Sequence, residues 1–268
     1  MSKTIADGFL RDIAKSYEAN DWERCGHALQ LALLQFPNDG RFIQWQGLAW
    51  HAQGAFSAAC RALETAALLI PLSVGAQIAW ADAHLAAHRR DDAVTILHFL
   101  TARIDKVSTP LLPRLASILG RAGEYALALD VCREASLREP EDDEACFGMA
   151  FFMNKLGYPV ECVLPLLRRA LALEPERPVY RLSVGVVCAR LGQSDEAYEL
   201  LCSIDPRQVT CMSCLQVMSR LFDKFDDAPR RDAALGRALQ LPRRREQAAQ
   251  SSAPASVASR PDSTPGVR

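Results

Sequence analysis

The 268-residue sequence has no uninterrupted apolar run that is long enough for a membrane-spanning helix. A bilayer requires about 20 consecutive apolar residues. The longest apolar stretch, residues 66–81, is interrupted by a proline and by small or polar residues, namely Pro71, Ser73, Gly75 and Gln77. Residues 1–10 contain one lysine and no apolar segment of signal-peptide length. We therefore expect a cytoplasmic protein that is not inserted in a membrane.

The sequence also lacks an excess of either charge, with 31 Lys and Arg residues against 32 Asp and Glu residues. This balance supplies no overall basic field, so nucleic acid is not expected as a partner. The nine cysteines are odd in number and sparse for a chain of this length. Their number excludes a disulfide-rich scaffold and predicts reduced thiols.

Common catalytic motifs are missing as well. There is no glycine-rich phosphate loop, no His-Glu-x-x-His and no Gly-x-Ser-x-Gly, and all five histidines lie at or before His98. We expect a protein that is not an enzyme and that holds no cofactor or metal.

Apolar periodicity ends near Leu241. Residues 243–268 contain no aromatic side chain, two large aliphatic residues, five basic residues and two acidic residues. Such a composition cannot bury enough apolar surface to fold. The sequence therefore predicts a folded part over residues 1–242 and a disordered tail over residues 243–268.

A pattern of small and bulky apolar residues recurs about every 34 residues. Its clearest copy consists of Gly47, Trp50, Gly54, Phe56, Ala59, Leu63, Ala66 and Pro71. A shift of 69 residues reproduces each size class in Ala116, Leu119, Gly123, Tyr125, Ala128, Cys132, Ala135 and Pro140. The period predicts six copies and a closing hairpin, at residues 5–37, 40–71, 74–105, 109–140, 143–175, 178–206 and 210–241.

Each copy predicts a helical hairpin. In the clearest copy one helix spans residues 41–53, Gly54 permits a tight turn, and a second helix spans residues 56–70 before Pro71 ends it. One hairpin cannot bury its apolar face alone, so the copies must stack into an all-α solenoid. The third copy has His84, His88 and Arg90 at a bulky apolar, a turn and an aromatic position, and we expect it to be distorted.

The period and the residues of the clearest copy resemble the tetratricopeptide repeat (TPR) family over residues 5–206. This resemblance implies a right-handed superhelix whose first helices line a concave groove for an extended or helical peptide. It also implies a protein-interaction scaffold or adaptor. An alternative is a chaperone or holdase for a secreted or complex-forming client.

The side of each predicted first helix that lies away from the positions of Gly47 and Trp50 defines candidate residues of the concave groove. These are Tyr17, Gln44, His51, Asp82, Arg121, Phe147, Phe151, Asn154, Lys155, Val186 and Arg190. We expect the three basic residues to pair with carboxylates and Phe147, Phe151 and Val186 to receive apolar side chains. The partner predicted is a protein or peptide segment that is acidic and partly apolar; the oligomeric state stays open.

Cys211 and Cys214 form a closely spaced pair, and Thr210 as a helix cap would place Cys211 at a helix N-terminus. Together with Cys202 they are candidates for a zinc site or a redox-active thiol pair. Zinc normally takes four ligands, and no second paired-cysteine motif is present. Packing in the core is therefore the favoured interpretation, with metal binding and thiol chemistry as alternatives.

Overall fold

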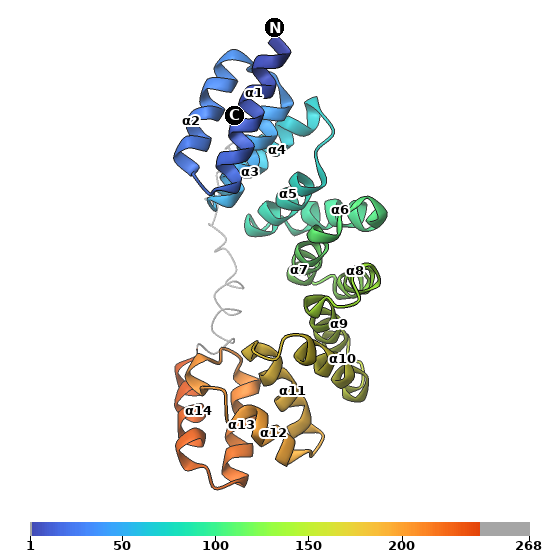
Figure 1. The fold of residues 1–268 in the computed structure, drawn as a ribbon, viewed down its shortest axis with the longest axis vertical. Coiled ribbons are helices and arrows are strands. Elements are labelled where there is room, and N and C mark those ends of the chain that lie inside the picture. The colour runs from blue at the N-terminus through green and yellow to red at the C-terminus, as the bar shows by residue number, and fades with distance from the viewer. Residues whose placement is uncertain (1, 242–268) are drawn as a thin grey trace, which may run out of the picture. The chain divides into compact units, whose positions relative to one another are not determined.

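The computed structural model describes residues 2–241, and this part contains fourteen α-helices, three short 3-10 segments and no strand (Figure 1). The helices are α1 (Ser2–Glu18), α2 (Trp22–Gln35), α3 (Gly40–Ala52), α4 (Phe56–Leu69), α5 (Val74–Ala86), α6 (Arg90–Thr101), α7 (Leu112–Ala122), α8 (Tyr125–Arg138), α9 (Asp143–Lys155), α10 (Val160–Leu173), α11 (Pro178–Arg190), α12 (Ser194–Leu201), α13 (Met212–Lys224) and α14 (Ala228–Gln240). The 3-10 segments are η1 (Ile104–Lys106), η2 (Thr109–Leu111) and η3 (Pro206–Gln208). The predicted all-α hairpin fold is confirmed, and the predicted tail lies outside the described residues.

The described chain divides into two compact units, unit 1 up to Tyr180 and unit 2 from Arg181. Unit 1 contains α1 to α10 and the first residues of α11. Unit 2 contains the remainder of α11, then α12, η3, α13 and α14.

Every hairpin turns through one residue with a positive φ angle. These residues are Asn20, Gly54, His88, Gly123, Gly157, Gly192 and Asp226, spaced 34 or 35 positions apart. At His88 the N–H of Arg89 donates to the carbonyl of His84 (2.9 Å), as the N–H of Ala55 donates to the carbonyl of Trp50 (2.9 Å). This bond satisfies a helix-terminal carbonyl. The third hairpin therefore turns like the others, and the expected distortion at His88 is absent.

Side chains at the helix starts set several of the boundaries. Asp21, Ser73 and Asp142 each accept a hydrogen bond from the backbone N–H three residues ahead. An oxygen at this position satisfies one of the amides that a helix start leaves without a partner. These caps explain why α2, α5 and α9 begin directly after short polar connections.

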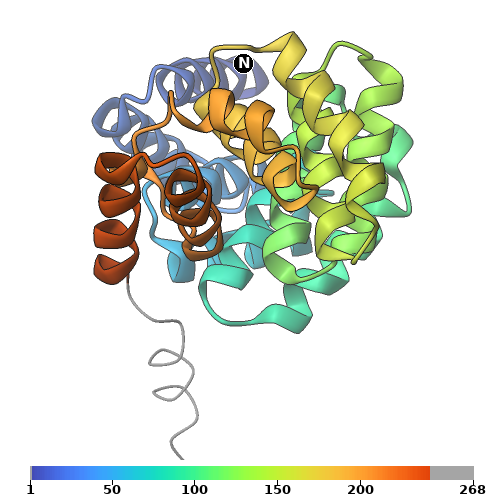
Figure 2. The ribbon, with the colours of Figure 1, turned by 90° about the horizontal axis from the view of Figure 1, so that it is seen from below.

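Glycine allows the two helices of one hairpin to approach closely. A Cβ atom at Gly47 of α3 would lie 2.6 Å from Cγ of Leu63 in α4, and a Cβ atom at Gly185 would lie 2.6 Å from Cγ of Leu201. The same contact thus occurs in unit 1 and again in unit 2. The first helices of unit 1 also contact one another in order, α1 with α3, α3 with α5, α5 with α7 and α7 with α9. Figure 2 shows these hairpins of unit 1 following one another around an arc.

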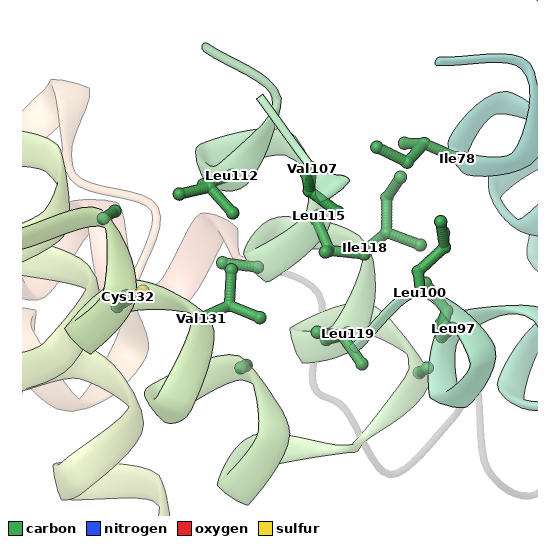
Figure 3. Close-up of a cluster of buried hydrophobic side chains, with 14 of the residues drawn as sticks. Ile78, Leu97, Leu100, Val107, Leu112, Leu115, Ile118, Leu119, Val131 and Cys132 are labelled. Carbon is green, nitrogen blue, oxygen red and sulfur yellow. The ribbon is translucent and has the colours of Figure 1, made fainter. Parts of the chain in front are cut away.

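The largest core cluster joins the third and fourth hairpins (Figure 3). It contains Ile78 of α5, Leu97 of α6, Leu115 and Leu119 of α7, and Val131 of α8, none of them more than 1% exposed. The irregularity expected in the third copy lies after α6, where η1 and η2 replace a direct entry into the next helix.

Arg138 at the end of α8 holds this irregular connection. Its guanidinium donates from Nη1 to the carbonyl of Val107 (2.6 Å) and from Nη2 to the carbonyl of Ile104 (2.9 Å), while Nε donates to Glu134 (2.8 Å). Backbone carbonyls outside a regular helix need such partners when water is displaced. Arg138 therefore stabilises the connection between α6 and α7 from a position on α8.

In unit 2 the second helix of the sixth hairpin is short. Helix α12 has eight residues and ends at Leu201, five positions before the buried Pro206. Tyr198 of α12 stacks on Phe225 at 4.4 Å between ring centroids and donates from its hydroxyl to Asp227 (3.0 Å). These contacts join α12 to the final hairpin, α13 and α14.

Candidate functional site

A polar cluster connects three consecutive first helices of unit 1. His51 of α3 lies with Nε2 2.9 Å from Oδ2 of Asp82 in α5, and Arg121 of α7 donates to the other oxygen of Asp82. Arg114 of α7 lies 3.4 Å from Nδ1 of His51. The His51 and Asp82 side chains are 9% and 15% exposed. These contacts therefore connect the second, third and fourth hairpins of unit 1.

The electrostatics of this cluster change the expected role of Arg121. Burial raises the pKa of Asp82, but the hydrogen bond from His51 and the charge of Arg121 outweigh it, so the pKa lies below its usual value. Asp82 is ionised at neutral pH and compensates the charge of Arg121. The prediction that Arg121 pairs with a ligand carboxylate is revised, because its partner is within the chain.

An apolar groove of about 560 Å³ lies between α7, α8, α9 and the first turn of α11, all in unit 1. Its apolar lining includes Leu112, Ala116, Tyr125, Phe147, Phe151 and Val179. Phe151 is 44% exposed, and Val179 is 46% exposed. A monomeric protein rarely leaves adjoining large apolar groups open to water without a functional reason.

Close helix packing forms the floor of this groove. A Cβ atom at Gly120 of α7 would lie 2.6 Å from Cε1 of Phe152, and one at Gly148 of α9 would lie 2.6 Å from Sγ of Cys132. Phe152 is 5% exposed and stacks on Tyr125, with 6.4 Å between ring centroids. The glycines let α7 and α9 approach their neighbours, so Phe152 turns inward and the adjacent Phe151 faces the open side.

The two ends of the groove differ in charge. At one end Arg177 donates to Asp143 (3.0 Å) and to Glu144 (2.8 Å), and the hydroxyl of Tyr180 donates to Asp143 (2.6 Å). At the other end the Lys155 ammonium lies 5.4 Å from the Phe151 ring centroid. Within residues 4–241 no carboxylate forms an ion pair with Lys155. Lys155 is therefore the groove cation whose charge is available to a ligand.

The structure brings together some of the predicted groove residues and separates others. Phe147, Phe151 and Lys155 line the groove on α9, and Asn154 is exposed beside Lys155. Phe147 contacts Tyr180, with ring centroids 4.9 Å apart. The sequence pattern does not identify Val179 or Tyr180, because none of its groove positions lies in the first turn of a first helix.

The remaining predicted residues have structural roles or different surroundings. The Gln44 side chain accepts a hydrogen bond from the Ser73 amide (2.8 Å), which connects α3 to the start of α5. Tyr17 packs edge-on against Trp22 and Trp45, with ring centroids 5.5 and 5.3 Å away. Val186 is 5% exposed in the core of unit 2, so it is not available to receive a ligand side chain.

The candidate thiols all belong to unit 2. Cys202 donates to the carbonyl of Glu199 (3.1 Å), Cys211 is exposed and Cys214 is partly exposed. Core packing, the favoured interpretation, therefore does not describe Cys211. Helix α13 begins at Met212, which makes Cys211 itself the N-cap residue in place of Thr210. No group of three or more His, Cys, Asp or Glu side chains suited to a metal ion occurs within the described residues.

Comparisons with known proteins agree with this architecture. No protein-family model matches the sequence. Human protein O-mannosyl-transferase TMTC1 is 28% identical over 117 residues, which are 44% of this chain and 12% of that protein. The chain therefore matches only a small part of that relative's length.

Solved structures give the fold. The C-terminal part of a TPR repeat-containing protein from Cytophaga hutchinsonii has a TM-score of 0.62 at 10% identity, covering 91% of this chain and 99% of that chain. YrrB, described as a TPR protein with an unusual peptide-binding site, has a TM-score of 0.52 at 13% identity over 64% of this chain and 88% of that chain. The chain has the tetratricopeptide repeat fold, as the sequence resemblance predicted. No helix within residues 2–241 combines the length and apolar character needed to cross a membrane.

Proposed function

We propose that this chain is a non-catalytic interaction scaffold whose groove on α7 and α9 holds a segment of a partner protein. The segment would carry one large apolar side chain and a nearby acidic residue. The observation that supports this most directly is the exposed Phe151 ring at an apolar groove, with the unpaired Lys155 ammonium beside it.

The groove fits a large apolar anchor. Its volume of about 560 Å³ exceeds that of one side chain and is lined mainly by aromatic and aliphatic groups. Burial of a Leu or Phe side chain there contributes about 1.5–3 kcal/mol of binding free energy. Aromatic anchors in such pockets commonly dominate the affinity of an interface.

The charges of the groove favour an acidic neighbour to that anchor. Arg121 and Arg177 are compensated by Asp82, Asp143 and Glu144, which leaves Lys155 to receive a carboxylate. Because Lys155 is exposed, this pairing should change the association rate and its salt dependence more than the final affinity. We therefore expect the apolar side chain of the partner segment to contribute more to the binding free energy than its acidic residue.

Transferase chemistry is not part of the proposal, since the human relative named as a transferase is matched over 12% of its length. The peptide-binding site named for YrrB supports a peptide as the occupant. A cytoplasmic location and the chaperone alternative stay predictions.

The test uses a displayed library of random peptides selected on the full chain. Selected peptides should combine a large apolar residue with an acidic residue. Their affinity should fall about tenfold or more for Phe151→Ala, because the anchor loses its main contact. For Lys155→Gln, the dependence of the association rate on salt should weaken.

The matched control is Phe99→Ala. Phe99 of α6 is also a half-exposed phenylalanine with a basic residue over its ring, Arg103 at 4.4 Å, but it does not line the groove. Binding to this variant should equal wild-type binding, and far-UV circular dichroism should show unchanged helicity for all three variants. Peptides that bind Phe151→Ala as tightly as wild type would place the binding surface elsewhere.

A further inference from the structure

Two thiols lie within one turn of each other at the start of α13. Cys211 is the N-cap residue of this helix and Cys214 is three residues further on. The side chain of an N-cap residue points forward along the first helical turn, toward the position that Cys214 occupies. The Cys211 sulfur lies 3.1 Å from the hydroxyl of Ser213, the residue next to Cys214.

The members of this pair differ in exposure. Cys211 is exposed to solvent and Cys214 is partly covered. Five other cysteines are buried, namely Cys25, Cys60, Cys132, Cys146 and Cys188. Cys162 of α10 is exposed like Cys211, but no second cysteine lies within ten positions of it along the chain. Among the described residues, Cys211 and Cys214 are the cysteines closest to each other in sequence, and they combine an exposed thiol with a partly covered one.

We propose that Cys211 and Cys214 form a reversible intrachain disulfide, with a low-molecular-weight disulfide of the glutathione type as the oxidant. Disulfides in reducing compartments are typically transient and regulatory, and an accessible thiol with an adjacent resolving thiol suits that role. The site goes beyond peptide binding, since it belongs to unit 2 and shares no residue with the groove.

The local electrostatics assign different roles to the two sulfurs. Burial raises the pKa of Cys211, but the Ser213 hydroxyl and the neighbouring Cys214 side chain outweigh this effect and lower that pKa. Burial and the neighbouring Cys211 raise the pKa of Cys214 to about 12, against a smaller opposing effect of the Arg190 charge. Cys211 is therefore the attacking thiolate and Cys214 the resolving thiol.

The reaction consists of two exchanges. The Cys211 thiolate attacks one sulfur of the small disulfide RSSR, the S–S bond breaks, and one thiolate RS⁻ leaves with the bonding electron pair and takes up a proton. Cys214 then loses its proton to solvent, attacks the Cys211 sulfur and expels the second RS⁻. Two protein thiols are oxidised to one disulfide, and one RSSR is reduced to two RSH.

The test treats the full chain with oxidised glutathione, blocks the remaining thiols with iodoacetamide and maps the peptides by mass spectrometry. In wild type, Cys211 and Cys214 should lose alkylation together, and their peptide should weigh two hydrogens less than the reduced form. The variant Cys214→Ser should instead accumulate a glutathione adduct on Cys211. Cys211→Ser should leave Cys214 largely unmodified, because the attacking thiolate is absent.

Cys162 in the same samples is the internal control for exposure alone. Cys211 should react at least several times faster than Cys162, in the folded chain but not in urea. Equal rates at the two residues in the folded chain, or a wild-type Cys211 adduct that never resolves into a disulfide, would overturn the proposal.

Discussion

Replacing Gly47 by alanine tests the contact that sets the distance between the helices of a hairpin. The new Cβ atom would lie 2.6 Å from Cγ and 2.8 Å from Cδ2 of Leu63. Leu63 is fully buried, so it cannot move into solvent to relieve the clash. Either α3 and α4 must separate or Leu63 must leave its rotamer.

The magnitude follows from two opposing effects. Alanine is favoured over glycine inside a helix by about 1 kcal/mol, whereas overpacking a tight core costs about 1–3 kcal/mol. Gly26 in α2 provides the matched control, because a Cβ atom there meets nothing within 4 Å. Gly26→Ala should keep the helix-propensity gain alone. The difference in unfolding free energy between the two variants should therefore be about 1–3 kcal/mol.

The assay is urea denaturation followed by far-UV circular dichroism. The midpoint should rise for Gly26→Ala and should stay level or fall for Gly47→Ala. Gly185→Ala should behave like Gly47→Ala, because its Cβ atom would lie 2.6 Å from Cγ of Leu201. An equal rise for Gly26→Ala and Gly47→Ala would refute the packing argument.

Two further perturbations test the connection that follows the third hairpin and a buried histidine within that hairpin. Arg138→Ala should lower the unfolding free energy by about 2 kcal/mol, because two backbone carbonyls lose charged donors. Arg133→Ala should change it by less than about 0.5 kcal/mol, because Arg133 pairs with the exposed Asp130 on the same helix. Equal effects of the two substitutions would contradict the proposed role of Arg138. Burial lowers the pKa of His84 below its ordinary 6.5, so the folded state binds fewer protons than the unfolded state and stability should fall as pH drops through 6.5. In thermal melts across this range His84→Gln should show a weaker pH dependence than wild type, and an unchanged dependence would exclude burial of His84 as its source.

Residues of α9 show how much of the groove could be predicted. Phe147, Phe151 and Lys155 recur on one face of a predicted helix, and the structure places all three at the apolar groove. Which of two adjacent phenylalanines turns inward depends on the space at Gly120, on a different helix. Helical periodicity predicts approximately which side of α9 faces the groove. The extent to which each side chain is buried depends on the neighbouring hairpin.

The charged residues were less predictable than the apolar ones. Arg121 and Asp82 are 39 positions apart and His51 lies 31 positions before Asp82, so their pairing depends on how three hairpins align. Arg177 likewise reaches back to Asp143, 34 positions earlier. A charge that looks available in the sequence can thus be neutralised across repeats, which left Lys155 as the free groove cation.

The sequence by itself determined the helices and their turns, because both depend on local properties. Side-chain size and spacing indicate the 34-residue period, the small residues at helix crossings and the turn position that adopts a positive φ angle. His88 adopts this positive φ at the position that the period predicts, although it is not a glycine. Only the tertiary structure decided that Arg138 closes the irregular connection, that Val186 is buried and that Cys211 remains exposed. Those outcomes depend on contacts between segments that are far apart in the sequence. Such contacts change the free energy of the fold but produce no periodic pattern in the sequence.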